Sequence, residues 1–486
     1  MKLEKPNLDK LKKLIDEDAS SQAKWDMRTA AAYYSNDNDI RERKRYFIDK
    51  FGVLSEETRL SNTKLSHPFF AKLVDQKASY LLGKPFSVST ENETYSDALN
   101  GYFDRDFIRV LKNVCTDAVI CGCSWLQVYY NPEGVLCFAR IPSIEVIPVW
   151  MDGDHTKLFA LIRVYATTNP LVDESNVDTK HVEYYTSAGV IRYQLTQGEL
   201  KQVSISGHAK VAFGEEKRDV DFGRIPFVPF RFNAHEISLL KYIKPLIDDY
   251  DALTSDISNN IKDTPNNIKV VRGYTGDPGE FTRNIALYRT VFVSETGSVE
   301  QIATSLDTTA CEAQLTRIRR DIFDAGNGVD AQDAAQGNTS GVAIRLRYAD
   351  LDMSCQNMAT EFSASLEALL YFIDADLSAK RVGDFSDEKV EFLFNTDCAV
   401  NESETIQNCS ASVGVLSKET LLANHPWVTD VKVELERVDI DSFGDEIAVS
   451  DETSTFDAKI ENSQNSGNDA KGVGHGQKTA TEITNA

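Results

Sequence analysis

Residues 341–381 read GVAIRLRYADLDMSCQNMATEFSASLEALLYFIDADLSAKR and predict one long helix. Ser340, directly before them, can cap the first turn. About 40 residues at 1.5 Å each give a helix of roughly 60 Å, which is longer than an ordinary domain needs. Apolar side chains recur along it at helical spacing: Val342, Leu346, Ala349, Met353, Met358, Phe362, Leu366, Leu369 and Ile373.

A second helix is predicted upstream, from Glu236 to Asp263, where Thr264-Pro265 ends it. Pro245 lies inside this stretch and either bends the helix or marks a later start near Lys244. The apolar stripe has the 3.6-residue period of a helix and consists of Ile243, Leu246, Ile247, Tyr250, Leu253, Ile257 and Ile261.

A β-rich excursion and a third helix connect these two. The excursion is predicted as two strands around a turn and a short helical piece: Asn267–Tyr274, Gly276–Gly279, a helix from Glu280, and Tyr288–Ser294. The spacing of Thr309 and Glu312 is that of a capping box, so a helix starts there. Gly326-Asn-Gly328 ends it.

Residues 330–340, DAQDAAQGNTS, separate the third helix from the long one. They offer no large apolar side chain that could anchor them in a core. Gly337 and Asn338 favour turns. We therefore expect a surface loop.

The N-terminal region predicts helices on either side of a basic cluster. Leu8, Leu11 and Ile15 have helical spacing. Residues 41–45, RERKR, are either a solvated helix face or a contact for nucleic acid or an acidic partner. Ser66–Leu82 predicts a further helix that ends before Gly83-Lys84-Pro85.

From Ser124 to Phe213 the apolar period changes to two, which predicts a β meander or sandwich of about 100 residues. The Asn131–Gly134 turn marks a hairpin. Prolines at 226 and 229 end this region, because proline supplies no N–H to a central strand.

The C-terminal region predicts one strand and several short helices. The strand is Val390–Phe394, and the helices are Glu402–Val413, Ser417–Ala423 and Thr429–Val438. Residues 441–486 are rich in Ser, Asn, Gly and acidic side chains, so we expect them to be disordered.

The composition excludes several classes of protein. At 486 residues and 42% hydrophobic side chains, the chain can build two or three domains. Its net charge of −23 argues against a tight grip on nucleic acid, although it does not exclude a protein that lets DNA pass. No stretch predicts a membrane span or a secretory signal, so we expect the chain to stay in the cytoplasm in which it is made.

No motif predicts catalysis, a cofactor or a metal. The eight cysteines are scattered and lack metal-ligand spacing, which favours reduced, buried thiols. Gly83-Lys84 and Gly472–Thr479 fail as phosphate-binding loops because the required glycine and lysine spacing is absent. The carboxylate pairs Asp248/Asp249 and Asp374/Asp376 are interpreted as solvated charges on helix faces. We predict that the protein is not an enzyme, and an unrecognised hydrolase remains an alternative.

Several segments resemble the portal proteins (head-to-tail connectors) of long-tailed double-stranded DNA bacteriophages. The segments are Leu60-Ser-Asn62 with Leu65–Pro85, Gly122–Tyr130, Arg140–Ser143 with Val146–Trp150, Arg224–Phe230, Leu246–Asp251, and Leu416–Thr420 with Asn424–Pro426. They follow the order of that family from about Lys44 to Val438, and together they are far more specific than any one alone.

The resemblance implies an α+β, ring-forming portal fold with an α/β wing, a helical stem, a small β-containing clip and a helical crown. The implied boundaries are wing 1–235, first stem helix 236–263, clip 264–307, second stem helix 308–326, tunnel loop 327–340, long helix and returning wing strand 341–400, crown 401–440 and disordered tail 441–486.

The resemblance further implies a non-enzymatic ring, twelve subunits in the family, at the capsid vertex of the virion. Double-stranded DNA is packaged and ejected through it, the large subunit of the terminase and then a head-tail adaptor dock on it, and major capsid and scaffolding proteins surround it. Assembly takes place in the host cytoplasm, without a membrane or cofactor. The alternative is a non-channel head-tail adaptor or minor capsid protein.

Three groups of residues are candidate sites. The channel or tunnel-loop group is Gln332, Gln336, Asn338, Thr339, Ser340, Arg345 and Arg347; the stem group is Arg317, Arg319 and Arg320; the clip group, for partner contact, is Arg272, Asp277 and Arg283. An acidic channel wall would keep DNA from sticking, so the arginines are candidate DNA contacts. Their alternative role, which we favour, is pairing with carboxylates of neighbouring subunits.

Overall fold

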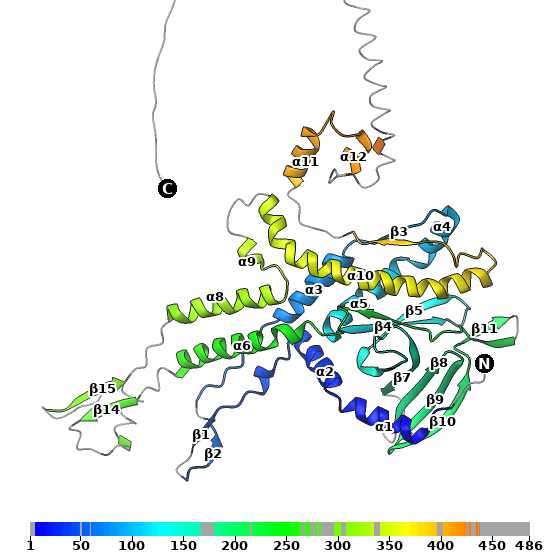
Figure 1. The fold of residues 1–486 in the computed structure, drawn as a ribbon. Coiled ribbons are helices and arrows are strands. Elements are labelled where there is room, and N and C mark those ends of the chain that lie inside the picture. Colours follow the sequence, from blue (N-terminus) through cyan, green and yellow to red (C-terminus); the bar gives the residue numbers. More distant parts are fainter. Residues whose placement is uncertain are drawn as a thin grey trace, which may run out of the picture. The chain divides into compact units, whose positions relative to one another are not determined.

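The protein is an α+β molecule, shown in Figure 1 as a computed structural model. Its contacts divide it into two units, Met1–Ala399 and Val400–Ala486, which are described separately. The structure describes residues 5–48, 51–58, 60–166, 179–213, 216–263, 268–272, 277, 279–280, 283, 296–302, 308–334, 341–395, 402–423, 425, 427–428, 434–435 and 437.

Helices of very different length make up much of the first unit. They are α1 (Leu8–Ala19), α2 (Gln22–Tyr34), α3 (Phe69–Leu82), α4 (Glu93–Tyr102), α5 (Arg105–Cys121), α6 (Leu240–Asp263), α8 (Thr308–Ala325), α9 (Ala331–Ala334) and α10 (Gly341–Ala379), with 3-10 turns η1 (Asp39–Glu42) and η2 (Ser143–Glu145). The prediction of one long helix is confirmed, since α10 has 39 residues. It ends before Arg381, whose φ of +61° no longer continues a helix.

The predicted β region forms two antiparallel sheets. Strands β6 (Val146–Trp150), β7 (Leu158–Ala166), β8 (Lys180–Thr186), β9 (Gly189–Thr196) and β10 (Glu199–Ser206) make a meander in the order β10-β9-β8-β7-β6. Strands β4 (Cys123–Tyr130) and β5 (Leu136–Ile141) make the second sheet with β13 (Phe227–Arg231), in the order β13-β4-β5. β13 lies beyond the predicted region, whose end was expected at the prolines, and Pro229 is accommodated because β13 is an edge strand. The meander packs against the smaller sheet, since Trp125 and Phe227 of the smaller sheet share a core with Leu161 of the meander. The predicted meander and the predicted sandwich are therefore both present.

Four pairs of short strands complete the first unit. They are β1 (Tyr46–Ile48) with β2 (Leu54–Glu56), β3 (Ser87–Ser89) with β16 (Glu391–Leu393), β11 (Ala209–Phe213) with β12 (Glu216–Val220), and β14 (Ile268–Arg272) with β15 (Ser298–Ile302). The predicted strand at Val390–Phe394 is confirmed as β16. The predicted strand at 288–294 lies outside the described residues, and the partner of β14 is the later segment β15.

The main core is built from α3, α5 and α10 around the three-stranded sheet. Leu73 of α3, Leu111 of α5 and Phe362 of α10 are completely buried. Phe362 packs edge-on against Phe230 of β13, with ring centroids 5.0 Å apart. The long helix is therefore held along its middle by the same apolar layer that covers the sheet.

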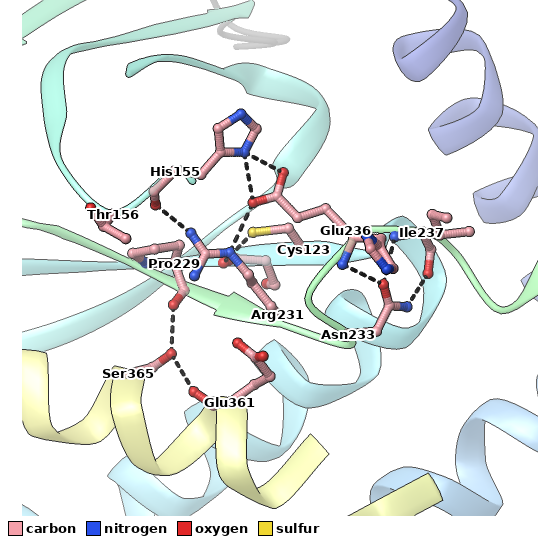
Figure 2. A network of polar contacts seen from close by, with 12 residues as sticks. Cys123, His155, Thr156, Pro229, Arg231, Asn233, Glu236, Ile237, Glu361 and Ser365 are labelled. Carbon is pink, nitrogen blue, oxygen red and sulfur yellow. Dashed lines mark hydrogen bonds and ion pairs between the residues drawn. The ribbon is translucent and has the colours of Figure 1, made fainter. Parts of the chain in front are cut away.

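The first predicted stem helix begins at Leu240 and not at Glu236. Glu236 has φ of +56°, outside the helical region, and its carboxylate accepts a hydrogen bond from Arg231 Nε at 2.9 Å. Figure 2 shows Arg231 between this carboxylate and the carbonyl of His155, to which it donates at 2.6 Å. Asn233 accepts from the N–H of Ile237 and donates to its carbonyl. The turn before α6 is thus tied to strand β13, and the helix continues through Pro245.

Gly122 makes this turn possible. Its φ is +87°, and a Cβ atom there would lie 2.0 Å from the carbonyl oxygen of Glu236. The N–H of Phe232 donates to the carbonyl of Gly122 at 2.9 Å. Only glycine allows the end of α5 and the entry to α6 to approach so closely.

One side of α6 carries a ladder of polar side chains, Asp251, Ser255, Asn259 and Asp263, which we call the α6 ladder. Successive members lie one helical turn apart and accept hydrogen bonds from alternate N–H groups of residues 61–67, which have no regular secondary structure. The donors are His67 at 3.1 Å, Leu65 at 2.9 Å, Thr63 at 2.7 Å and Ser61 at 3.0 Å. Four helical residues rise about 6 Å, which matches two extended residues.

The basic cluster 41–45 pairs with carboxylates of the same chain, and its interpretation as a helix face is wrong from Arg43 onward. Arg43 pairs with Asp256 at 3.0 Å and Arg45 with Asp263 at 3.1 Å, both on α6. Residues 43–45 are not helical. Arg43 and Arg45 therefore bind the C-terminal half of α6.

The interpretation of Asp374 and Asp376 as solvated charges is wrong. Asp376 is 3% exposed and accepts hydrogen bonds from Tyr102 at 2.6 Å and Tyr130 at 3.0 Å. Burial raises the pKa of Asp374, which accepts from Tyr95 at 2.6 Å. These carboxylates tie the far end of α10 to α4 and β4.

The second unit contains two described helices, α11 (Glu402–Ala411) and α12 (Lys418–Ala423). They match two predicted helices, although the first ends two residues earlier than expected. The predicted helix at 429–438 lies mostly outside the described residues, and so does 441–486. In the described parts of both units, no helix is long and apolar enough to cross a membrane.

Replacing Ser255 with Ala tests the α6 ladder. The N–H of Leu65 then loses its acceptor, so we expect the free energy of unfolding to fall by about 1 kcal/mol. Ser258→Ala is the matched control, since Ser258 lies on the same helix but outside the ladder. Urea unfolding followed by circular dichroism measures both, and equal effects of the two substitutions would contradict a role for the ladder.

Candidate functional site

The segment between α8 and α10 is the candidate site, because it contains the predicted tunnel loop and joins α8 to the long helix α10. Residues 326–332, which we call the loop base, follow α8 and are held against α3. The loop base is the described beginning of the predicted loop. Residues 335–340, its remainder, lie outside the described residues.

The side-chain amide of Gln76 bonds to the backbone of the loop base, as the backbone of a neighbouring strand would. Its side-chain oxygen accepts from the N–H of Val329 at 3.0 Å, and its side-chain nitrogen donates to the carbonyl of Val329 at 2.7 Å. Both backbone groups of one residue are thereby satisfied by one amide. The backbone at Val329 is fixed in position and direction.

Arg319 and Asp330 form the strongest contact of the loop base. The guanidinium of Arg319, on α8, donates two hydrogen bonds to the two carboxylate oxygens, at 2.5 and 2.8 Å. This bonding holds the pKa of Asp330 below its ordinary value. Lys72 adds a third charge, 3.9 Å from the same carboxylate. Paired, two-point contacts of this kind fix geometry as well as adding energy.

Lys77 is completely buried between α3, the loop base and α10. Its ammonium donates to the carbonyl of Asn327 at 3.0 Å and to the hydroxyl of Ser354 at 2.9 Å. Burial lowers its pKa to about 8. One side chain of α3 therefore links the end of α8 to the long helix.

Two glycines let the loop base lie flat on α3. A Cβ atom at Gly328 would lie 2.1 Å from a methyl carbon of Leu73, and one at Gly326 would lie 2.7 Å from the other. The predicted stop signal Gly326-Asn-Gly328 is therefore also a packing requirement.

Residues of α10, which follows the loop in sequence, are also held by α3. Tyr80 of α3 donates to Asp352 of α10 at 2.9 Å. Tyr80, Val329, Leu351 and Cys355 form a small buried cluster of their own. The loop base and the part of α10 around Asp352 are thus both fastened to α3, and α10 runs from there back to the end of the loop at Gly341.

The predicted loop residues are only partly described. Gln332 is exposed, and its N–H donates to Asp330 at 3.1 Å. Gln336, Asn338, Thr339 and Ser340 lie outside the described residues. Arg345 lies in α10, and Arg347 is exposed on the same helix.

The three stem arginines have different surroundings. Arg317 and Arg320 are exposed and face Asp321 and Asp324 one turn further along α8, at 4.0 and 3.6 Å. Arg319 is bound to Asp330. All three find carboxylates within the same chain, whereas we favoured pairing between subunits.

The predicted clip residues are exposed where they are described. Arg272 ends β14, and Asp277 accepts a hydrogen bond from the N–H of Glu280 at 2.9 Å. Arg283 is exposed.

Sequence reasoning missed the residues of α3 that hold the loop base. A signal was present for Lys77, because it stands four residues from both Leu73 and Leu81, in the middle of the apolar stripe. Gln76 carried no such signal. Among the described residues, no group of His, Cys, Asp and Glu side chains is arranged to hold a metal, and the seven described cysteines are free thiols.

Two solved structures resemble this chain distantly. One is the neck of a native gene transfer agent particle computed with C12 symmetry, with a TM-score of 0.42 and 12% identity, covering 74% of this chain and 90% of that one. Another is the virion of the native gene transfer agent particle, with a TM-score of 0.44 and 12% identity, covering 73% and 88%.

Sequence relatives are closer and span nearly the whole chain. The portal protein of Bacillus phage SPP1 is 27% identical over 441 residues, which cover 89% of this chain and 86% of that protein. The portal protein of Clostridium phage phiCD119 is 26% identical over 450 residues, covering 87% and 94%. The family model described as phage portal protein, SPP1 Gp6-like, matches residues 12–442. The chain therefore belongs to the SPP1 Gp6-like family of phage portal proteins.

Proposed function

We propose that this portal protein forms a ring, dodecameric in the complete particle, through which double-stranded DNA is packaged and ejected. The ring stands at the portal vertex of the capsid and assembles in the host cytoplasm. It performs no reaction itself. The large subunit of the terminase drives the DNA, and a head-tail adaptor later takes the place of the terminase.

The observation that carries this proposal is that the loop joins two anchored elements, the loop base and α10. Gln76 and Arg319 hold Val329 and Asp330 before the loop, and Tyr80 holds Asp352 after it. A loop between two anchored elements can be presented at a constant place in each subunit of a ring. Such a loop suits contact with a moving duplex, because its own position does not depend on the duplex.

The described elements support an assignment of parts. We assign residues 1–235 to the wing, α6 and α8 to the stem, 264–307 to the clip, 327–340 to the tunnel loop, 341–400 to the long helix and returning strand, and 401–440 to the crown. The tail 441–486 lies beyond them. We propose that Arg272, Asp277 and Arg283 of the clip meet the terminase and then the adaptor, and that the major capsid and scaffolding proteins contact the outside of the ring.

The acidic net charge of the chain supports the passage of DNA through the ring without tight binding. The chain carries 75 acidic and 52 basic residues, so a ring would present a mostly negative surface that repels phosphates. Arg317 and Arg320 are exposed on α8 and balanced by carboxylates, which suits weak contacts with DNA. With Arg345, Arg347 and the polar loop side chains, they would touch the backbone without reading sequence. We assign Arg319 to holding the loop base.

The first prediction concerns the ring. Purified full-length protein should form closed rings with a central hole, because heterologous contacts that close generate cyclic assemblies. Electron microscopy and native mass spectrometry measure this. Monomers or dimers alone, across protein concentrations and salt conditions, would rule out the proposed conduit.

The second prediction concerns the loop. Replacing residues 333–340 with a short Gly-Ser linker leaves Asp330 in place, so rings should still form. Packaging of DNA into procapsids should fall at least tenfold, measured as nuclease-protected DNA. A shuffled order of residues 335–340 is the control and should package normally, since the contacts are independent of sequence. Normal packaging with the linker would favour the head-tail adaptor alternative.

The third prediction concerns the different contributions of Arg319 and Arg320 to stability. Arg319→Gln should lower the free energy of unfolding by about 2 kcal/mol, because it removes the two charged hydrogen bonds to Asp330 and leaves only the more distant Lys72 beside that carboxylate. Arg320→Gln, at an exposed pair, should change it by less than about 0.5 kcal/mol. The pKa of Asp330 is lowered in the folded state, so the difference is present above about pH 4, the ordinary range of a carboxyl, and shrinks as the pH falls further. Chemical unfolding at pH 7 and pH 3 measures both, and equal losses for the two variants would refute the assignment.

A further inference from the structure

The hairpin of β1 and β2 exposes an apolar face. Ile48 stands opposite Leu54, and Tyr46 lies two residues from Ile48 on the same face. These side chains are exposed by 72%, 65% and 56%. Each strand has three residues, and a hairpin this small is not stable in water by itself. Its apolar face is therefore a surface that needs a partner.

The α6 ladder fixes where this hairpin emerges. The incoming chain pairs with Asp256 through Arg43 and then with Asp263 through Arg45. The outgoing chain starts at Ser61, whose N–H also donates to Asp263. Both ends of the hairpin are thus held beside the C-terminal end of α6, on the ladder side of that helix.

The opposite side of α6 carries a second exposed apolar surface. The seam between α6 and α8 is buried at Ile247, Ile318 and Ile322. Towards the C-terminal end of α6 it opens, with Ile261 65% exposed and Cys311 and Leu315 of α8 only half-buried. We call Ile261, Cys311 and Leu315 the open seam.

The anchors of the hairpin and Ile261 lie on opposite sides of α6. Ile261 stands two residues from both Asn259 and Asp263 of the ladder, so it lies about 200° around the helix from them. Asp263, which holds both ends of the hairpin, and Ile261 both belong to the last turn of α6. Within one chain Ile48, Leu54 and Ile261 all remain exposed.

A ring brings two such surfaces together. Cyclic symmetry places every subunit at the same level, and a head-to-tail contact joins one side of a subunit to the opposite side of the next. Apolar surfaces held on opposite sides of the last turn of one helix are what such a contact requires. A second copy of this chain is the occupant that fits.

We propose that the β1–β2 hairpin of each subunit docks on the open seam of the adjacent subunit in the ring. The proposal rests on the ring proposed above, and it names the contact that joins the stems. Ile48 and Leu54 lie against Ile261 and Leu315 of the neighbour, which brings the hairpin close to the neighbour's Cys311. The contact covers the apolar face of the hairpin and closes the α6–α8 seam.

Disulfide trapping tests this contact with one substitution. Ile48→Cys in the full chain places a thiol next to the native Cys311 of the adjacent subunit. Mild oxidation of assembled rings should then yield a ladder of covalently linked subunits on non-reducing gels, with more than half of the protein in multimers. Adding Cys311→Ser should abolish the ladder. Val203→Cys, at a residue of β10 that is 61% exposed, should give none.

A second variant tests the same contact without crosslinking. Ile48→Asp with Leu54→Asp should lower the ratio of rings to monomers at least tenfold, and Val203→Asp should not change it. The circular dichroism of the double variant should match that of the unaltered chain. Rings that form normally in this variant, or a ladder that persists without Cys311, would overturn the contact. If the unaltered chain forms no rings, the ring itself is refuted.

Discussion

Backbone that is neither helix nor strand still has to satisfy its hydrogen-bonding groups, and two segments of this protein do so with side chains of one helix each. Residues 61–67 rely on Asp251, Ser255, Asn259 and Asp263 of α6. The loop base relies on Gln76 and Lys77 of α3. In both places a rigid helix determines the course of an irregular segment. The direction of the hairpin and the position of the loop follow from these two sets of bonds.

The sequence predicted the elements whose period was long and regular. The apolar stripe of α10 and the two-residue period of the sheets were both found. No prediction covered α5, although Phe107, Leu111, Val114 and Ala118 have helical spacing, because its β-branched residues weaken the helical signal. The start of α6 was placed too early, because the positive φ of Glu236 depends on its contact with Gly122, far away in the sequence.

The candidate site was predictable in position but not in its supports. Composition alone predicted a loop at residues 330–340, and their described part contains the short helix α9, Ala331–Ala334. Apart from the bonds of Arg319 to Asp330, the bonds that hold the loop base come from α3, which lies about 250 residues earlier. A polar side chain such as Gln76 gives no sign in sequence that it will serve a distant backbone. The burial of charged side chains was mispredicted for the same reason, because it also depends on residues that are distant in sequence. Asp376 looked solvated until the tyrosines of α4 and β4 were placed around it.

Lys77 gives the protein a reporter of its own opening. At this position the amine is completely enclosed, so an acylating reagent reaches it only when α3 and α10 part. Its rate of acylation therefore counts how often the two helices separate, and it needs no added label. The acylation rate of Lys77 could therefore be compared between a resting portal and a portal through which DNA is being packaged.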